Sequence, residues 1–322
     1  MKLSEVVNQF LLDCEVRGRS NTTLITYRYR LNDLVQLLEQ LCGVTELEQV
    51  SIHHLRQCVQ HLLTAKVMYS CGRRTEGDTL SPNTVRAHVR AFRAFFTWCY
   101  QEELISTNPV KRLGTPKVPQ RVVATFTAEH IDKMIAACDT RTTMGFRDYV
   151  ILLFLLDTGV RISEVSNLHV TDVHDRYVKV FGKGRKEREI GIHPEMSKLL
   201  WKYIHKYRRP LDPNETALFI GRGRPLQTDG VHEVVKRIQQ KTGMSDMKFS
   251  AHVFRHTFAK MYLERGGDLF KLSREMGHSD VQVTRTYLED FTSTEARKEH
   301  TAFSPIANIK LQKKSFRRKK QK

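Results

Sequence analysis

The sequence has no long apolar run. Its longest one, Tyr149–Leu156, has eight residues, whereas a helix that crosses a bilayer needs about 20. The first ten residues are amphipathic and include Glu5, which is unlike a secretory signal peptide. The six cysteines include no Cys-x-x-Cys pair, so a disulfide scaffold and a zinc ribbon are disfavoured. We therefore expect no membrane partner and a location in the reducing cytoplasm.

Acidic residues are scarce relative to basic ones. The 35 Asp and Glu face 53 Lys and Arg, which gives a net charge of +18 and an isoelectric point near 9.7. Such an excess predicts a polyanionic partner, most simply nucleic acid. Residues 310–322 hold eight basic residues and no acidic one, but the rest of the chain is basic without them. We expect this tail to be a solvated basic run.

The length of 322 residues predicts about two domains. Apolar residues recur at helical spacing through the first third of the chain. A polar, glycine-containing stretch at 69–79 is expected to be a loop, and prolines 109, 116 and 119 mark a basic linker. The expected organisation is a helical domain at 1–108, a linker at 109–125, a second domain at 126–302 and a basic tail at 303–322.

The second domain combines helices with a hairpin. The apolar period changes between Tyr177 and Ile192, around Gly182-Lys183-Gly184, which predicts two antiparallel strands. Helices are expected at Ile131–Cys138, Asp148–Leu156, Ile162–Leu168, Pro194–Tyr207, Asp229–Lys241, Ala251–Glu264, Leu269–Met276 and Val281–Leu288. The predicted fold is therefore mainly α, with an α+β second domain that holds a small antiparallel sheet.

The strongest local motif is His252-Val253-Phe254-Arg255-His256. On a helix His252, Arg255 and His256 share one face. An arginine there calls for an anion, and a neighbouring histidine can bind the same anion or move a proton. Zinc held by His252, His256 and His278 is an alternative, but Arg255 would place a positive charge between the ligands. An ordinary polar helix face is the other alternative.

Three further signals lie before and after this motif. Arg161 follows a glycine break, and Glu164 lies one turn later, where it can hold the arginine. Lys183 lies at the predicted hairpin tip, which is not a P-loop because GxxxxGK[ST] is absent. Gly277-His278 is followed by Tyr287 nine residues later. Taken singly, each is also common as an ion pair, a charged turn or an ordinary tyrosine.

Taken together and in this order, these residues resemble the tyrosine recombinases, also called phage-type integrases. The resemblance covers residues 3–290, including Ser20–Tyr27 and Asn108-Pro109 in the first domain. It implies a helical core-DNA-binding domain followed by a catalytic domain of the DNA breaking-rejoining fold. It also implies strand exchange through a 3′-phosphotyrosine with no metal or ATP. Since the resemblance begins almost at Met1, we expect a compact recombinase without a separate arm-site domain.

The resemblance also assigns roles to residues. Tyr287 would be the nucleophile, and Arg161 and Arg255 would clamp the phosphate. His252 would accept the tyrosine proton, Lys183 would protonate the 5′-oxygen, and His278 would bind a phosphate oxygen. Glu164 and His256 would support the site. DNA contacts are expected from Lys111, Arg112, Arg185, Lys186 and Arg188.

The expected partner is double-stranded DNA at specific recombination sites, bound by a homo-tetramer. Integration, excision, transposition and dimer resolution would use the same residues. Two alternatives remain: an enzyme that relaxes supercoils in the manner of type IB topoisomerases, and a DNA-binding accessory protein. The filled catalytic positions argue against the accessory protein.

Overall fold

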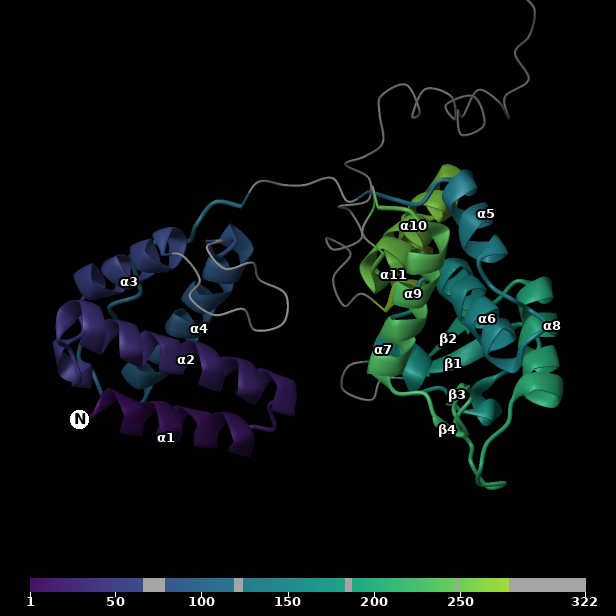
Figure 1. The fold of residues 1–322 in the computed structure, drawn as a ribbon. Coiled ribbons are helices and arrows are strands. Elements are labelled where there is room, and N and C mark those ends of the chain that lie inside the picture. Colours follow the sequence, from purple (N-terminus) through teal and green to yellow (C-terminus); the bar gives the residue numbers. More distant parts are fainter. Residues whose placement is uncertain (66–78, 119–123, 183–186, 246, 248, 278–322) are drawn as a thin grey trace, which may run out of the picture. The chain divides into compact units, whose positions relative to one another are not determined.

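A computed structural model describes residues 1–65, 79–118, 124–182, 187–245, 247 and 249–277. The segment 66–78, the expected helix Val281–Leu288 and the basic tail lie outside the described residues. The chain divides into two compact units, Met1–Arg121 and Val122–Lys322 (Figure 1). No helix within the described ranges is long and apolar enough to cross a membrane.

Unit 1 is helical in its described residues. Its elements are α1 (Leu3–Val16), α2 (Asn21–Cys42), a 3₁₀ turn (Leu47–Gln49), α3 (Ile52–Thr64) and α4 (Pro82–Gln101). Local chemistry sets the helix ends: the Ser20 hydroxyl accepts from the backbone N–H of Thr23, and Gly43 ends α2 with a left-handed φ of 67°. Ser81 caps α4, and Pro82 occupies its tolerated first position.

The core of unit 1 lies between α1, α2, α3 and α4, which contact one another. Phe10, Phe92, Phe95 and Phe96 are all buried in it. The core continues past residue 108, because Val110 and Leu113 are buried against it as well. The first residues of the expected linker therefore pack with unit 1.

Unit 2 surrounds a hairpin with helices (Figure 1). Its helices are α5 (Ala128–Ala136), α6 (Thr143–Thr158), α7 (Ile162–Ser166), α8 (Pro194–Lys202), α9 (Thr228–Thr242), α10 (Ala251–Glu264) and α11 (Leu269–Met276), with a 3₁₀ turn at Val170–Asp172. Its strands are β1 (Tyr177–Phe181), β2 (Glu187–Gly191), β3 (Ile220–Gly221) and β4 (Arg224–Pro225). The mainly helical fold with a small antiparallel sheet, predicted above, is confirmed.

Helix α6 is the centre of unit 2. It contacts α5, α8 and α10, so it is buried on nearly all sides, as its continuous apolar run predicts. Gly159 ends it with a φ of 59°. That turn lets the chain reverse at once into α7, and it places Arg161 at the start of α7.

The β1–β2 hairpin has the predicted antiparallel pairing, from Tyr177 opposite Gly191 to Phe181 opposite Glu187. Val178 and Ile190 are opposite each other and fully buried, so one face of the hairpin joins the core. Helix α11 contacts β2. The hairpin residues 183–186 lie outside the described part of the chain.

Some helix ends differ from the prediction: α5 begins at Ala128, α6 begins at Thr143 and α7 ends at Ser166. Two further local features also differ. The expected helix Pro194–Tyr207 ends as α8 at Lys202, and a π-helical turn follows at Tyr203–Tyr207. Tyr203 is buried there, and its hydroxyl accepts a hydrogen bond of 3.1 Å from the backbone N–H of Ile220. The short β3–β4 hairpin, which supplies this N–H, was not predicted, although Gly221-Arg222-Gly223 is a typical turn sequence.

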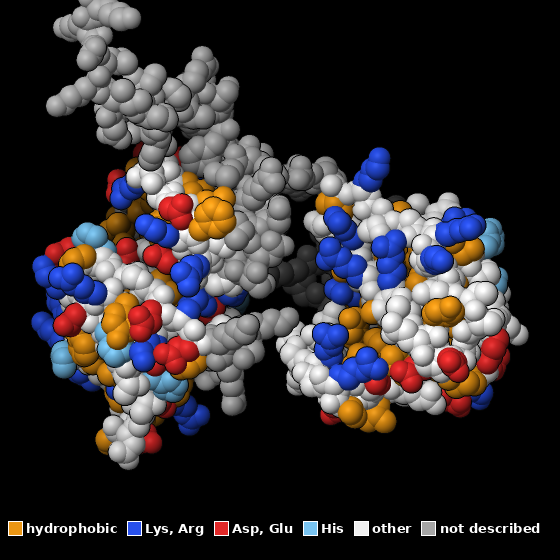
Figure 2. All heavy atoms as spheres, turned by 180° about the vertical axis from the view of Figure 1, so that it is seen from behind, with side chains coloured by type: hydrophobic (Ala, Val, Ile, Leu, Met, Phe, Trp, Pro, Cys, Tyr) orange, Lys and Arg blue, Asp and Glu red, His pale blue; other side chains and the backbone are white. Residues whose placement is uncertain are grey.

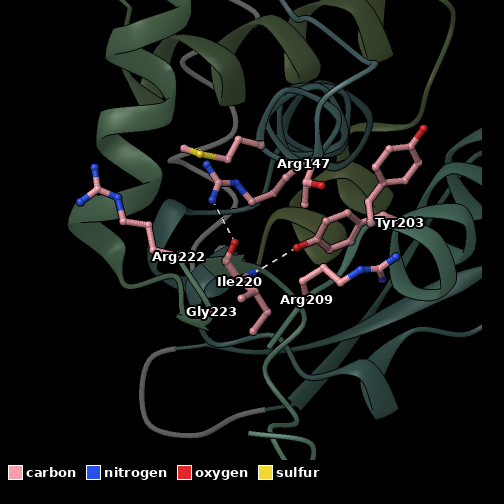
Figure 3. A pocket seen from close by; sticks show the side chains of 9 residues that line it. Arg147, Tyr203, Arg209, Ile220, Arg222 and Gly223 are labelled. Carbon is pink, nitrogen blue, oxygen red and sulfur yellow. Dashed lines mark hydrogen bonds between the residues drawn. The ribbon is translucent and has the colours of Figure 1, made fainter. Parts of the chain in front are cut away.

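The β3–β4 hairpin closes one side of a pocket of about 230 Å³. Arg147 lies in its interior and donates to the carbonyl of Ile220 at 2.9 Å, while Arg209 and Arg222 lie on either side of it (Figure 3). The buried charge of Arg147 is balanced by Asp148, which also pairs with Arg237. This ion-pair cluster joins α6, α9 and the hairpin.

Candidate active site and DNA-binding face

Arg161 begins the candidate site at the N-terminus of α7. Its guanidinium Nη1 donates to Glu164 Oε1 at 2.9 Å, and its backbone N–H donates to Glu164 Oε2 at 2.9 Å. This reciprocal capping arises because Glu164 is the third residue of the helix, within reach of the first turn's unpaired N–H groups. The Arg161 side chain remains 41% exposed, so it can meet a ligand from solvent.

Glu164 is the buried carboxylate of the site, only 4% exposed. Besides Arg161 it accepts two hydrogen bonds of 2.9 Å from Arg188, one on each carboxylate oxygen. Burial alone would raise the pKa of Glu164, but the hydrogen bonds from Arg188 and from the Arg161 backbone outweigh burial and hold that pKa below its usual value. Glu164 therefore stays ionised and balances part of the arginine charge.

Arg255 lies on α10 and is 5% exposed. Its Nη1 donates to the carbonyl of Gly159 at 2.7 Å, and its Nη2 donates to the carbonyl of Met276 at 2.5 Å. His252 and His256 are three residues before and one residue after it on the same helix, with His252 exposed and His256 half-buried. The residues of the His252–His256 motif thus lie on α10, as the spacing predicts.

The last turn of α11 brings the arginines together. Three successive carbonyls accept from three different guanidiniums: Glu275 from Arg188 at 2.8 Å, Met276 from Arg255 at 2.5 Å, and Gly277 from Arg161 at 3.5 Å. The final carbonyls of a helix have no partner within it, and its C-terminus favours positive charge. This turn, which we call the arginine-binding turn (residues 275–277), therefore positions all three side chains.

The structure thus unites Arg161, Glu164, Arg188 and Arg255, which are up to 94 residues apart in the sequence. Lys183, Arg185, Lys186, His278 and Tyr287 lie outside the described residues. His278 follows the arginine-binding turn directly in the sequence. Within the described ranges, no three His, Cys, Asp or Glu side chains come together as a metal site needs.

A cleft of about 570 Å³ lies beside the arginine-binding turn, between α10 and the end of β2. Asp157 and Glu275 both line it. Burial raises the pKa of each carboxyl, and the charge of Asp157 raises the pKa of Glu275 further. The backbone carbonyl of Glu275 thus accepts a hydrogen bond from Arg188, while the Glu275 side chain lines this neighbouring cleft.

Unit 1 carries a row of arginines that was not predicted from the sequence. Arg86, Arg90 and Arg93 are spaced i, i+4, i+7 on α4, so they share one face of the helix. Arg30 of α2 joins them by donating to the backbone of Ala87. None of these four arginines has a carboxylate partner among the described residues. The spacing was visible in the sequence and could have identified this face, which we call the α4 arginine face.

Further exposed basic residues of unit 1 lie in the expected linker, which one arginine of the α4 arginine face contacts. Figure 2 shows several Lys and Arg side chains close together on one side of this unit. Lys111 and Arg112, the DNA contacts expected in the linker, are both exposed. Arg93 ties this segment to α4, because its guanidinium donates to the carbonyl of Leu113. Exposed basic side chains of this kind suit a phosphate backbone.

Comparisons with known proteins agree with this geometry. The profile of the "Phage integrase family" matches residues 124–293, and that of "Phage integrase, N-terminal SAM-like domain" matches residues 7–74. Tyrosine recombinase XerD of Listeria monocytogenes serovar 1/2a is 28% identical over 295 residues, which cover 88% of this chain and 94% of that protein. Tyrosine recombinase XerC of Chlamydia trachomatis serovar L2 is 31% identical over 211 residues, covering 64% and 67%.

A solved structure shows the same fold. The Tn1549 transposon integrase in complex with a circular intermediate DNA superposes with a TM-score of 0.70 at 20% identity, over 94% of this chain and 99% of that chain. The catalytic profile alone spans more than half of the sequence. The order of Arg161, Arg255 and Tyr287 and the union of both arginines at one turn agree with that match. The chain belongs to the phage integrase family, the tyrosine recombinases.

Proposed function

We propose that this protein is a site-specific DNA recombinase that cleaves and rejoins duplex DNA through a 3′-phosphotyrosine on Tyr287. The observation that supports it most directly is the convergence of Arg161 and Arg255 on the arginine-binding turn. Two guanidiniums side by side suit one phosphodiester, whose two non-bridging oxygens each accept from a guanidinium. The sequence continues from that turn to His278 and then to Tyr287.

The arginines would act on the transition state. When the tyrosine oxygen attacks, negative charge develops on the equatorial oxygens of a pentacoordinate phosphorus. Donors already in place stabilise that charge without reorganising. The carbonyls of Gly159 and Met276 hold Arg255, and Glu164 holds Arg161, before DNA arrives. The positive charge that metal ions supply in other phosphoryl-transfer enzymes would come here from arginine.

The remaining steps are proton transfers. A tyrosine hydroxyl has an ordinary pKa near 10 and needs a base at neutral pH. We assign His252 to accept the proton of Tyr287 as its oxygen bonds to phosphorus. The bond from phosphorus to the 5′-oxygen breaks, and Lys183 protonates that oxygen, while His278 donates to a phosphate oxygen. The phosphotyrosine conserves the ester, so a 5′-hydroxyl from another strand can reverse the step and rejoin the DNA.

DNA would be bound by both units. We assign residues 1–108 as the core-DNA-binding domain, 109–125 as the linker, 126–302 as the catalytic domain and 303–322 as a basic tail. The α4 arginine face, Lys111 and Arg112 would contact phosphates from unit 1. Arg185 and Lys186, beside Lys183 in the sequence, would contact them from the catalytic domain. Phosphate contacts position the protein and supply most of its salt-dependent affinity.

The reaction also suggests the assembly and the location. Exchange between two duplexes breaks four strands, and each break needs one Tyr287, so four protomers suffice. We propose a homo-tetramer on two recombination sites, which serve integration, excision, transposition or resolution. A cytoplasmic location fits a DNA substrate and the free thiols of Cys14, Cys58, Cys99 and Cys138.

Covalent capture tests the proposal. The purified protein is mixed with a pool of random-sequence duplexes that carry a nick, so that cleavage releases a short strand and traps the adduct. Sequencing the trapped DNA would identify the cleaved site. The wild-type protein should form adducts on a defined sequence, and Tyr287→Phe should bind that sequence but form none. Tyr262→Phe is the matched control and should still form the adduct.

Other outcomes would redirect the assignment. An adduct formed by Tyr287→Phe would point to a different nucleophile. Relaxation of supercoiled plasmids that lack the captured sequence would favour the topoisomerase-like alternative. Specific binding by the wild-type protein without any adduct would favour a DNA-binding accessory protein.

A further inference from the structure

We propose that Arg188 is a positioning residue for strand cleavage, which holds Glu164 and thereby fixes Arg161 at the scissile phosphate. This inference rests on the proposed function, because it assumes that Arg161 binds the phosphate. It gives Arg188 a different role from the DNA contact expected for a basic residue beside the hairpin tip.

The geometry of Arg188 is that of a guanidinium used inside the protein. Its Nη1 and Nη2 each donate to one oxygen of Glu164 at 2.9 Å, and its Nε donates to the carbonyl of Glu275 at 2.8 Å. All three nitrogens therefore have protein partners. The side chain is only 15% exposed, against 41% for Arg161. A phosphate that bound Arg188 would have to displace the Glu164 carboxylate from a bidentate ion pair.

Arg161 depends on this arrangement more than Arg255 does. Among the described residues, its side chain has two hydrogen-bond partners, Glu164 and the carbonyl of Gly277, and the second distance is 3.5 Å. The position of Glu164 therefore decides where the Arg161 guanidinium lies. Each Glu164 oxygen accepts one hydrogen bond from Arg161 and one from Arg188. Loss of Arg188 would therefore leave the carboxylate free to move.

Gly277 shows how closely Arg188 approaches the arginine-binding turn. A Cβ atom built on Gly277 would lie 2.8 Å from Cζ and 2.9 Å from both Nε and Nη1 of Arg188. The guanidinium thus lies against bare backbone, at the residue whose carbonyl accepts from Arg161. Glycine is needed here for its left-handed φ of 63° and for the space that Arg188 takes.

Arg188 also keeps Glu164 ionised. Two guanidiniums face the Glu164 carboxylate, Arg161 from its own helix and Arg188 from β2, and burial opposes both. Without Arg188, the pKa of Glu164 would rise, because burial would then be opposed by Arg161 alone. A protonated Glu164 would hold Arg161 less well, so cleavage would weaken as the pH falls through the raised pKa.

The decisive test is a double-mutant cycle on the captured DNA sequence, read as single-turnover cleavage. Arg188→Gln, Glu164→Gln and the double variant are compared with wild type. We expect Arg188→Gln to cleave DNA roughly 10- to 100-fold more slowly, with little change in DNA affinity. That range is typical when a hydrogen-bond partner that orients a ligand residue is removed from a metal site. The double variant should be no slower than Glu164→Gln, because Arg188 acts through that residue. If the rate losses of the two single variants multiply in the double variant, the proposal is overturned.

A leaving-group test separates Arg188 from Lys183, which belongs to the same hairpin. A substrate with sulfur in place of the 5′-oxygen releases a thiolate, whose acid has a pKa near 8.5 and needs no protonation. This substrate should restore the cleavage rate of Lys183→Ala but not that of Arg188→Gln. Rescue of both would show that Arg188 acts by placing Lys183, and would overturn its assignment to Arg161.

Two further measurements guard against a purely structural effect. The acid limb of the pH–rate profile should move to higher pH in Arg188→Gln, which a general loss of stability would not cause. Arg208→Gln is the matched control, because Arg208 is likewise a half-buried arginine of unit 2 held by the protein, through the carbonyls of Glu215 and Ala217, but away from the site. This variant should cleave normally when folded.

Other variants cover a failure to fold. If Arg188→Gln does not fold, because Glu164 is left buried with one partner, the double variant and Gly277→Ala provide the same information. Gly277→Ala should displace the Arg188 guanidinium and slow cleavage without removing any charge. If an Arg188 variant cleaves at the wild-type rate and its DNA binding depends less on salt, then Arg188 is a phosphate contact and the proposal is wrong. Failure of wild type to form an adduct would instead refute the proposed function.

Discussion

The guanidinium of Arg255 donates to the backbone carbonyl of Gly159, 96 residues earlier, at 2.7 Å. Arg161 lies two residues after Gly159. The glycine turn at the end of α6 therefore determines the position of both arginines: it begins the segment that bears one and accepts a hydrogen bond from the other. The geometry of the site depends on this backbone turn as much as on the side chains.

Gly159→Ala should therefore damage both stability and cleavage. The residue has a left-handed φ of 59°, and a Cβ atom there would lie 2.4 Å from Cδ1 of Phe258. Left-handed backbone costs an alanine about 1–2 kcal/mol, and the forced repacking should add roughly 1–3 kcal/mol. Thermal unfolding and the rate of adduct formation measure the two effects.

Gly243→Ala is the control for that variant. Gly243 ends α9 in the same unit with a φ of 65°, but no atom lies within 4 Å of its would-be Cβ. It should lose only the backbone term and keep the wild-type cleavage rate. Equal melting temperatures for the two variants would mean that Phe258 moves aside freely and that the close packing at Gly159 is unimportant.

Arg161→Lys and Arg255→Lys should each lose most strand cleavage although they keep the charge. A lysine presents no planar fork to a phosphate, and in place of Arg255 it would offer one nitrogen where two guanidinium nitrogens donate separately to the carbonyls of Gly159 and Met276. The expected loss is on the order of 10²–10³ in rate. The measurement is single-turnover cleavage, repeated with EDTA, which we expect to leave the wild-type rate unchanged. A lysine variant that cleaves at the wild-type rate would remove that arginine from the site.

Arg90→Gln should reduce DNA binding through the loss of a phosphate contact. Arg90 is exposed at the centre of the α4 arginine face. Each lost contact should flatten the slope of log affinity against log salt by about 0.9. Arg17→Gln is the control, because Arg17 is an exposed arginine of the same unit that is paired with Asp13. Identical salt slopes for both variants would place the DNA on another face of unit 1.

Deletion of residues 310–322 should weaken binding to cognate and unrelated DNA alike. The segment holds eight basic residues and begins more than twenty residues after Tyr287. The salt slope should fall, while cleavage of saturating substrate should persist. A deletion that changes only discrimination between sequences would show that the tail reads bases or binds a partner protein.

Glu275→Gln should stabilise the protein at neutral pH. Burial and the nearby charge of Asp157 raise the pKa of Glu275 above its value in the unfolded chain, so ionising it costs folding free energy. The penalty is absent below the unfolded pKa and complete above the raised pKa. We expect a melting temperature roughly 1–3 °C higher at pH 7, with the difference vanishing near pH 4. A difference that persists at pH 4 would assign the effect to packing.

Much of the fold could be read from local patterns. Helices α10 and α11 have the predicted bounds, and the β1–β2 hairpin lies within its predicted range. These elements are specified by caps, apolar spacing and turn residues within a few positions of each other. The ordered set Arg161, Arg255 and Tyr287 pointed to the family in the same way, because it needs residue identity and spacing only.

Other features depend on residues far apart in the chain. The π-helical turn at Tyr203–Tyr207 accompanies a hydrogen bond from Ile220 to Tyr203, and the linker residues Val110 and Leu113 join the core of unit 1. No sequence pattern within either segment predicts these distant contacts. The α4 arginine face is an intermediate case. Its spacing can be read from the sequence, but only the tertiary structure shows that its arginines form no ion pairs with carboxylates among the described residues.

Arg188 shows this division most clearly. Its sequence context, a basic residue beside a basic hairpin tip, indicates a DNA contact. The fold turns its side chain inward to Glu164 and the carbonyl of Glu275, 24 and 87 residues away. The sequence by itself determined which residue types are available for the chemistry and in what order. Only the tertiary structure decided which arginines reach solvent and which hold others in place, because that depends on where unpaired helix-end carbonyls and a buried carboxylate meet.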